Sequence, residues 1–390
     1  MTGLAGNWNY PTNIRFGAGR IDELAAACRE IGIERPLLVT DRGLAGNPMI
    51  TEAFAAAKTS GLRIALFSDI SSDPTGEDVT HGGSALRAHG ADGVIAFGGG
   101  SSLDAGKAMA FAAHQTRPLW DFEDVGDNFK RADASKILPV IAVPTTAGTG
   151  SEVGRASVIK DEDARVKRII FHPLMLPKMV IADPALTIGL PPALTAAVGM
   201  DALSHNLEAY FAPGYHPFAR GIAVEGVRLV RDWLATAVRE PANIEARAHM
   251  LAASQAGATA FQRGLGAMHA LAHPLGALYG VHHGLLNAVL MPYVIAANRS
   301  AIEGDAEYLA SVLGFGGGVD GLLAWVLALR REVDIPHTLA DVGIPADDVA
   351  LVARMAVEDG SAGTNPIDFS AAAYADLFEK ALAGDLPTGA

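Results

Sequence analysis

The alternation of short apolar runs with amphipathic stretches between about residues 11 and 185 constrains the fold most. Strand-like runs occur in RPLLVTD, RIALFSD, DGVIAFGGG, LPVIAVPTT and KMVIADP, and helical spacing appears between some of them, as in IDELAAACREIG and SLDAGKAMAFAA. Strands that alternate with helices pack as a parallel sheet with crossover helices on its faces. The first half of the chain therefore predicts an α/β domain.

The second half carries almost no strand pattern. Helical spacing dominates after about residue 190, as in PPALTAAVGMDALSHNLEAYF, HGLLNAVLMPYVIAAN and VDGLLAWVLALRREV. Pro184, Pro191 and Pro192 interrupt the periodicity at this change, and the last two can start the first long helix. A chain of 390 residues accommodates two domains. We predict an α/β domain over residues 1–188 and an all-helical domain over residues 189–390, with ligands bound in the cleft between them.

The charge balance excludes one large class of partners. The formal net charge is −13, and no run of basic residues occurs, whereas phosphate backbones are bound by clustered lysine and arginine. The start MTGLAGNWNYPTN has neither a basic region nor an apolar core, and no apolar stretch reaches the roughly 18 residues that suggest a membrane span. We expect a cytoplasmic protein that binds neither nucleic acid nor membrane. The single cysteine, Cys28, cannot form an internal disulfide and is interpreted as a buried core thiol.

A glycine run in the first half is typical of a phosphate site. Gly98, Gly99, Gly100 and Ser101 directly follow the strand VIAF and open a helix, so their amides are placed at a positive helix N-terminus. A plain turn would need fewer glycines. The nucleoside-triphosphate loop pattern fails, because Gly100 and Gly106 enclose five residues and Lys107 is followed by Ala108. The run Gly17-Ala18-Gly19 lacks the third glycine of the common dinucleotide fingerprint. The cluster GFGGG at 314–318 follows a helical stretch and is interpreted as a loop between helices.

Two further polar features lie at strand ends of the first half. The loop PTTAGTGSE at 144–152 ends the strand VIAV, and its hydroxyls suit either contacts to a cofactor or a hydrogen-bonded turn. Asp41 closes the strand LLVT, where a carboxylate can bind a ribose diol and repel a 2′-phosphate, which would favour NAD over NADP. Asp41 could equally cap the helix that follows.

Acid and histidine spacing in the second half indicates a metal site. Asp201 and His205 are four residues apart on a helical pattern and so share a helix face. His269 and His273 repeat this spacing, and the pair His282-His283 follows ten residues later. A lone histidine on an apolar helix is usually a core residue, but this repeated spacing is hard to explain by packing. Imidazoles with one carboxylate suit a borderline divalent ion such as Fe²⁺ or Zn²⁺, whereas calcium demands more oxygen ligands.

The motifs GGGSSLDAGK, PTTAGTGSEV, GMDALSHNLEAY and GAMHALAHPLGALYGVHHG, in this order and spacing, resemble the iron-containing (group III) alcohol dehydrogenases over essentially the whole chain. The resemblance implies a Rossmann-like dinucleotide-binding domain, a metal-binding helical domain and a homodimer. It also implies that the metal ligands are Asp201, His205, His269 and His283. His273 resembles the family's additional active-site histidine, near the nicotinamide and not bound to the metal.

The same resemblance assigns the cofactor side. Asp41 corresponds to the NAD selector, Gly99, Gly100 and Ser101 correspond to the pyrophosphate cradle, and Gly98 and Asp104 are also counted among the cofactor-binding residues. Thr145, Thr146 and Thr149 are implied near the nicotinamide half, and Lys167 is similar to the family's cofactor-binding lysine. Three positions depart from the commonest pattern: Asp73 replaces a frequent Asn, His282 a frequent Pro, and Ile367 a frequent Arg. His282 and the loop 359–367 could border the substrate pocket, so the resemblance does not identify the alcohol.

The predicted function is therefore oxidation of an alcohol, or reduction of the matching aldehyde, by hydride transfer to or from NAD at one divalent metal ion, Fe²⁺ or Zn²⁺. His273 or His282 could relay the released proton. A glycerol-dehydrogenase-like zinc enzyme would use three ligands, and a maleylacetate-reductase-like enzyme would use no metal. A dehydroquinate-synthase-like lyase would need more basic residues for its phosphorylated substrate. A nucleotide- or metal-binding protein without turnover is the alternative outside enzymes.

Overall fold

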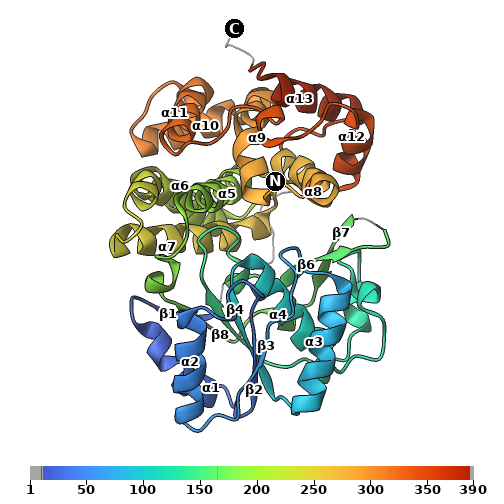
Figure 1. The fold of residues 1–390 in the computed structure, drawn as a ribbon. Coiled ribbons are helices and arrows are strands. Elements are labelled where there is room, and N and C mark those ends of the chain that lie inside the picture. Colours follow the sequence, from blue (N-terminus) through green and yellow to red (C-terminus); the bar gives the residue numbers. More distant parts are fainter. Residues whose placement is uncertain (1–9, 11, 165, 387–390) are drawn as a thin grey trace. The chain divides into compact units, whose positions relative to one another are not determined.

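The computed structural model describes residues 10, 12–164 and 166–386 (Figure 1). The described chain forms two compact units. The first unit comprises Tyr10–Thr146 and Gly150–Gly189, and the second comprises Ala147–Thr149 and the residues from Leu190 onward. That residues 1–188 and 189–390 are separate domains remains a prediction.

A six-stranded parallel sheet forms the centre of the first unit. Its strand order is β1-β8-β5-β4-β2-β3, and every pair is parallel. The strands are β1 (Asn13–Phe16), β2 (Pro36–Val39), β3 (Ala65–Phe67), β4 (Gly93–Gly98), β5 (Val140–Pro144) and β8 (Met179–Ala182). The four inner strands are buried at every residue, as expected for a parallel sheet covered on both faces. The five strands that the sequence predicted are β2, β3, β4, β5 and β8.

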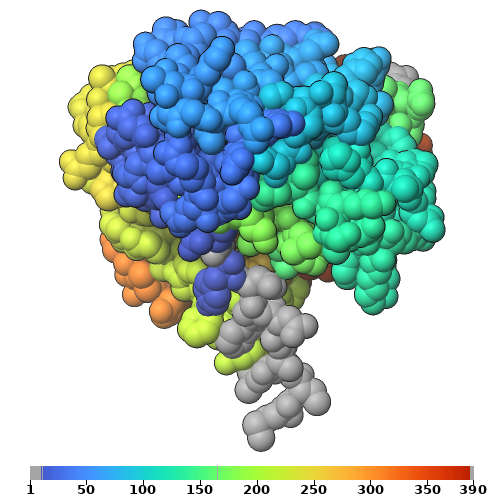
Figure 2. Space-filling model, turned by 90° about the horizontal axis from the view of Figure 1, so that it is seen from below, coloured from blue at the N-terminus to red at the C-terminus, as the bar shows by residue number. Residues whose placement is uncertain are grey.

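Helices cover the two faces of this sheet (Figure 1). They are α1 (Leu24–Glu30), α2 (Pro48–Thr59), α3 (Gly76–His89) and α4 (Gly100–Ala112). Alternate strand residues enter different cores, because side chains along a strand point to opposite faces. Val94 and Ala96 pack in the core with α3 and α4, whereas Ile95 and Phe97 pack in the core with α1 and α2. Figure 2 shows residues of the helices α1 to α3, in blue and light blue, forming the surface on one side. The predicted α/β fold is confirmed.

A two-stranded antiparallel hairpin, β6 (Ala156–Asp161) and β7 (Val166–Phe171), was not predicted. It forms a separate sheet in the first unit, beside α4 and α3 (Figure 1). Buried and partly buried residues alternate strictly along β6, the pattern of a strand with one covered face. Charged residues within both strands mask this short pattern in the sequence.

The described residues of the second unit form helices and connecting loops and no strand, as predicted. Its long helices are α5 (Pro192–Phe211), α6 (Pro217–Arg239), α7 (Ile244–Ala260), α8 (Ala267–Tyr279), α9 (His283–Ala297), α10 (Arg299–Leu313), α11 (Gly318–Glu332), α12 (Val349–Glu358) and α13 (Ala371–Ala383). Pro191 is the N-cap of α5 and Pro192 its first residue, so the two prolines start this helix as expected. The glycine cluster at 314–318 links α10 to α11, which confirms the predicted loop.

Helix α5 is the centre of the second unit, because it is buried continuously from Thr195 to Phe211 and packs against α6, α7 and α9. Glycines on the neighbouring helices permit this close approach. A Cβ on Gly284 of α9 would lie 2.5 Å from the carbonyl oxygen of Ala197, and one on Gly257 of α7 would lie 2.8 Å from Cβ of His205. The glycines therefore allow the backbones of α7 and α9 to approach the face of α5 that carries polar residues.

No single helix within the described residues is long and apolar enough to cross a membrane; α9 and α10 meet these criteria only as a pair bent by 106°.

Candidate functional site

The first unit has a candidate nucleotide cradle where its strand order changes direction. The strand β3 lies on one side of β2 and β4 on the other, and open α/β sheets bind ligands at the carboxyl ends of strands flanking such a point. Asp41 follows β2, and Gly98 ends β4, with Gly99 as the N-cap of α4. The glycine run thus opens a helix directly after a buried strand, as predicted.

Contacts within the cradle join these chain segments. The Asp41 carboxylate accepts hydrogen bonds from Oγ of Ser102 and the backbone N–H of Leu44, both at 3.0 Å. A Cβ on Gly98, whose φ is 150°, would lie 2.5 Å from Oγ of Ser102, so this position requires glycine. Asn47, not Asp41, caps the following helix α2, so the helix-cap alternative for Asp41 is wrong.

Two strand ends meet at the same edge of the cradle. The N–H of Thr145, after β5, donates to the carbonyl of Gly98, the last residue of β4, at 2.9 Å. Thr146 lies beside Gly99, where a Cβ would be 3.3 Å from Cγ2 of Thr146. Thr149 belongs to the second unit. The structure therefore brings Thr145 and Thr146 together with the glycine run.

Asp104, on α4, binds the chain segment that follows β5 through hydrogen bonds. Its carboxylate accepts from Oγ of Ser151 and, at 3.0 Å, from the N–H of Val158. The buried ammonium of Lys107 lies 3.2 Å from the same carboxylate and donates to the carbonyl of Ser151 at 2.9 Å. These contacts assign Asp104 a structural task, and its predicted contact with the cofactor stays a prediction.

Lys167 on β7 forms an ion pair with Asp73, with 2.8 Å between Nζ and Oδ1. The neighbouring residue of Asp73, Ser72, accepts a hydrogen bond at its carbonyl from Oγ of Ser101 at 2.6 Å. The hairpin, the loop before α3 and the first turn of α4 are thereby connected. Asp73, where the family frequently has Asn, thus pairs its carboxylate with Lys167, the lysine that the resemblance implies in cofactor binding.

The second unit brings acid and histidine side chains from three helices into one cluster. The candidate ligand atoms of Asp201, His205 and His269 lie within 4.8 Å of one another, and all three residues are buried. His283, the first residue of α9, has its Nε2 atom 3.8 Å from Oδ1 of Asp201. The rings of His205 and His269 stack with centroids 4.8 Å apart. All four predicted ligands therefore lie together, with His283 at the margin.

Hydrogen bonds determine which ring nitrogen two of these histidines present. Nδ1 of His205 lies 3.2 Å from the carbonyl oxygen of Gly148, and Nδ1 of His269 lies 2.6 Å from a carboxylate oxygen of Glu208. A carbonyl and a carboxylate both accept, so Nδ1 carries the proton in each ring and Nε2 keeps its lone pair. A metal ligand requires this neutral form with an exposed lone pair.

Asn287 lies one turn after His283 and contacts three candidate ligands. Its Nδ2 donates to Oδ1 of Asp201 at 2.9 Å and lies 3.2 and 3.1 Å from Nε2 of His269 and His283. The amide thereby engages one oxygen of Asp201 and leaves the other for an ion.

The electrostatics of the cluster favour a bound cation. Burial raises the pKa of Asp201, but the surrounding imidazoles and the Asn287 hydrogen bond outweigh it and lower this pKa to about 2. Burial and the neighbouring imidazoles hold the pKa of His269 well below its usual value. Burial raises the pKa of Glu208 to about 7 against the lowering effect of backbone N–H groups, and a nearby cation would favour its charged form. A divalent ion would take the place of the imidazole protons, and an ionised carboxylate with imidazoles so deprotonated suits a borderline divalent ion.

His273 lies beside the cluster. Its ring stacks on His283 with centroids 5.2 Å apart, and its Nδ1 lies 2.8 Å from Oδ2 of Asp359. His282 is exposed at the N-cap of α9. His273 is therefore placed next to the candidate ligands while its Nδ1 is engaged elsewhere.

Three residues of this site were not found from the sequence: Glu208, Asn287 and Asp359. Glu208 is three residues after His205 and seven after Asp201, the spacing of one helix face, so the pattern could have indicated it. Asn287 has the same signal, four residues after His283. Asp359 has no such spacing: the resemblance indicated only that the loop 359–367 borders the pocket, and folding brings Asp359 to His273.

Comparisons with known proteins agree with this geometry. The family model described as iron-containing alcohol dehydrogenase matches residues 11–184, and its C-terminal counterpart matches residues 195–382. A 4-hydroxybutyrate dehydrogenase of Cupriavidus necator is 39% identical over 385 residues, covering 96% of this chain and 99% of that protein. A 1,3-propanediol dehydrogenase of Klebsiella pneumoniae is 34% identical, covering 94% and 96%.

Solved structures give the same result. A 1,3-propanediol oxidoreductase aligns with a TM-score of 0.92 and 33% identity, covering 97% of this chain and all of that one. A sulfoacetaldehyde reductase of Bifidobacterium kashiwanohense in complex with NAD⁺ aligns with a TM-score of 0.89 and 29% identity, covering 98% and 100%. The fold and the site define a metal-dependent NAD oxidoreductase. The chain belongs to the iron-containing alcohol dehydrogenase family, as its sequence motifs predicted.

Proposed function

We propose that this NAD-dependent alcohol dehydrogenase interconverts a short ω-hydroxy acid, with 4-hydroxybutyrate as the first candidate, and the corresponding aldehyde. The observation that carries the activity is the buried cluster of one carboxylate and imidazoles in the second unit. The substrate proposal is supported by the 39% identity with the 4-hydroxybutyrate dehydrogenase over nearly the full length of both chains.

The proposed metal ligands are Asp201, His205, His269 and His283. When bound, NAD supplies the hydride-accepting nicotinamide and the divalent ion, Fe²⁺ or Zn²⁺, supplies Lewis-acid chemistry toward an alcohol oxygen. The chain contributes the orientation of the ligands: Gly148 and Glu208 hold the protons at Nδ1 of two imidazoles, and Asn287 holds one oxygen of Asp201.

The proposed cofactor residues are those of the cradle. The amides at the end of β4 and the start of α4, at Gly98, Gly99, Gly100 and Ser101, suit a pyrophosphate, because the first amides of a helix have no intrahelical acceptor. Asp41 suits a ribose diol. Thr145, Thr146, Thr149 and Lys167 complete the proposed set.

His273 is the proposed proton acceptor. Asp359 accepts a hydrogen bond from the N–H at Nδ1, so Nε2 of His273 keeps a lone pair that can take the proton an alcohol releases. His282 is the second candidate for this relay.

We further propose that the enzyme is a cytoplasmic homodimer. The absence of any cysteine pair is consistent with a reducing compartment, and light scattering on a sizing column would measure the assembly.

The test is formation of NADH by apo-protein supplied with Fe²⁺, Zn²⁺ or no metal. The panel would contain 4-hydroxybutyrate, 1,3-propanediol and ethanol, with His269→Ala as the control. We expect metal-dependent turnover, highest kcat/KM for 4-hydroxybutyrate, and no turnover by the variant. Metal-dependent turnover with another alcohol would overturn only the substrate. NAD binding without metal-dependent turnover would overturn the ligand assignment.

A further inference from the structure

We propose that Glu208 is a positioning residue for the metal site. It fixes the proton of His269 at Nδ1, and it joins α5, which carries Asp201 and His205, to α8, which carries His269. The inference rests on the proposed function, because it takes His269 to be a ligand. It concerns a residue outside the ligand set whose charge sets the affinity of the site.

The geometry around Glu208 carries the proposal. One oxygen, Oε2, lies 2.6 Å from Nδ1 of His269 and accepts the N–H of Gly266 at 2.9 Å, while Oε1 accepts the N–H of Met268 at 2.7 Å. Glu208 itself lies on α5, three residues after His205. A single side chain on α5 thus fixes both the start of α8 and the ring of His269, which α8 carries.

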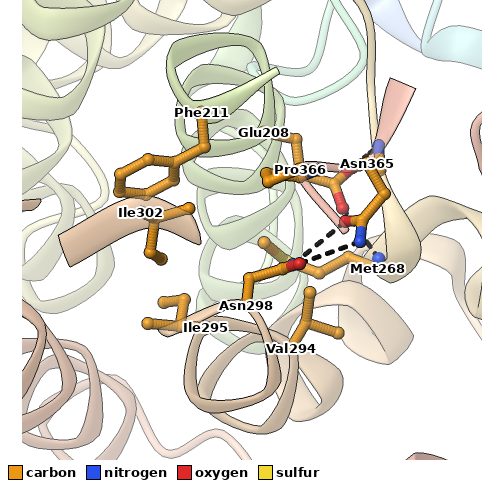
Figure 3. A pocket seen from close by; sticks show the side chains of 10 residues that line it. Glu208, Phe211, Met268, Val294, Ile295, Asn298, Ile302, Asn365 and Pro366 are labelled. Carbon is orange, nitrogen blue, oxygen red and sulfur yellow. Dashed lines mark hydrogen bonds between the residues drawn. The ribbon is translucent and has the colours of Figure 1, made fainter. Parts of the chain in front are cut away.

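These contacts replace the cap that α8 lacks. Its N-cap residue, Gly266, has no side chain, so the first amides of the helix need acceptors from elsewhere. Glu208 serves two of them, and Oδ1 of Asn365 accepts the third, from Ala267, at 3.1 Å. Asn365 is held in turn by reciprocal amide hydrogen bonds with Asn298, at 3.0 and 2.9 Å (Figure 3).

Gly266 is required at this place by space as well. A Cβ there would lie 2.9 Å from Oε1 of Glu208 and 2.8 Å from Oδ1 of Asn365. Any larger residue at position 266 would therefore collide with both acceptors. Figure 3 shows Glu208 and Asn365 side by side on one wall of a small cavity whose other walls are largely apolar.

Capping alone does not explain a carboxylate at this position. Glu208 is only 5% exposed, and burying a carboxylate is costly unless it is fully hydrogen-bonded. Asn365 shows that a neutral amide can cap the same helix. A carboxylate differs in having two oxygens that only accept, so it alone can receive two backbone N–H groups and the imidazole N–H together. Its charge also strengthens His269 as a ligand, since carboxylate–histidine–metal arrangements increase ligand basicity.

The experiment compares three variants of the full-length protein. Glu208→Gln keeps the size of the side chain but replaces one acceptor with a donor, Asn365→Ala removes a cap of α8 without touching His269, and His269→Ala removes the ligand. The dissociation constant for Co²⁺ is measured by competition with a chromophoric chelator, together with the visible Co²⁺ spectrum, the thermal midpoint Tm and the dissociation constant for NADH.

We expect Glu208→Gln to weaken Co²⁺ binding by roughly 10- to 100-fold and to alter the Co²⁺ spectrum, with NADH binding unchanged. Asn365→Ala should lower Tm and leave Co²⁺ affinity unchanged. Equal Co²⁺ affinity and spectrum in Glu208→Gln and the native protein would overturn the proposal, and so would an equal loss in Asn365→Ala, which would reduce Glu208 to a helix cap.

The control with His269→Ala separates this inference from the ligand assignment. Unchanged Co²⁺ binding in that variant would overturn the proposed function itself. Should Glu208→Gln fail to fold, Glu208→Asp keeps the charge but withdraws it by one methylene. Its Co²⁺ affinity is then expected to fall, whereas unchanged affinity would count against a fixed position for the carboxylate.

Discussion

Oδ2 of Asp359 lies 2.8 Å from Nδ1 of His273, and the other oxygen of the same carboxylate accepts the backbone N–H of Ser361 at 2.8 Å. Both side chains of the pair are largely buried, at 16% and 17% exposure. Burial raises the pKa of Asp359, but the nearby imidazole and the hydrogen bonds outweigh this effect and lower it. Asp359 therefore stays ionised and determines which nitrogen of His273 is protonated.

Replacing Asp359 with Asn should lower kcat while leaving the binding of NADH unchanged. An amide can present either its oxygen or its N–H₂ group to Nδ1, so both tautomers of His273 become populated and Nε2 is no longer reliably an acceptor. A loss on the order of 10²-fold in kcat is expected from weakened proton transfer. Steady-state kinetics and a fluorescence titration with NADH measure the two effects.

A double-variant comparison is the control for this prediction. If Asp359 acts through His273, adding Asp359→Asn to His273→Ala should lower kcat no further. Additive losses would show that Asp359 acts on the substrate or on the loop 359–367 instead.

Gly284→Ala should damage the metal site by separating two helices. The added Cβ would lie 2.5 Å from the carbonyl oxygen of Ala197 and 2.9 Å from Cβ of Asp201, so α9 must move away from α5 and take His283 with it. Such overpacking costs about 1–3 kcal/mol of unfolding free energy. Urea unfolding measures this loss, and titration with Co²⁺ should show weaker binding.

The matched control is Gly304→Ala on α10, where an added Cβ meets nothing within 4 Å. Alanine is the better helix former, so this variant should gain up to about 1 kcal/mol and bind Co²⁺ normally. Native stability and affinity in Gly284→Ala would contradict the close packing of α9 on α5.

The fold class was predictable because the hydrophobic patterns of its strands and helices are local in the sequence. Buried parallel strands are continuous apolar runs, so β4 and β5 are visible in VIAF and VIAV, and the helices of the second half repeat apolar residues with their own period. The edge strand β1 and the hairpin of β6 and β7 were missed because their sequences mix charged with apolar residues. Only β6 alternates buried with partly buried residues, and β1 and β7 are largely exposed or partly buried.

The site was predictable where its residues share a helix face. Asp201 and His205 are one helical turn apart, so their spacing indicates shared ligation. Partners that come from other parts of the chain have no such signal: the carbonyl of Gly148 on His205, and Asp359 on His273, are contacts made only by tertiary packing. Asp41 was ambiguous in the sequence, because a single acid after a strand suits a cap and a ribose equally.

Asp73→Asn should strengthen the binding of NADH. Asp73 holds the ammonium of Lys167 at 2.8 Å, and the pair is partly exposed, at 37% and 19%. Removing the negative charge frees the lysine for the phosphates of the cofactor and removes a repulsion. NADH titrations at low and high salt should show a tighter, more salt-dependent complex than in the native protein.

Lys167→Met provides the comparison, with weaker NADH binding expected. If Asp73→Asn weakened NADH binding as much as Lys167→Met does, Asp73 would be the residue that aims the lysine at the cofactor, and the competition between the two would be refuted.

Cys28 should resist thiol reagents in the folded protein and react fully in denaturant. It lies on α1 and is completely buried, and burial, with the nearby charge of Asp92, raises the pKa of its thiol to about 12. Because the folded-state pKa is raised, the neutral thiol is favoured in the fold. This contribution to stability is complete below the ordinary thiol pKa of about 8.5 and is lost as the pH rises through about 12.

A chromogenic disulfide at mildly alkaline pH measures the reactivity of Cys28 with and without urea. Labelling of the native protein at the rate of the unfolded chain would mean that α1 opens readily. In that case Cys28→Ala should cost far less stability than the loss expected for a buried core side chain.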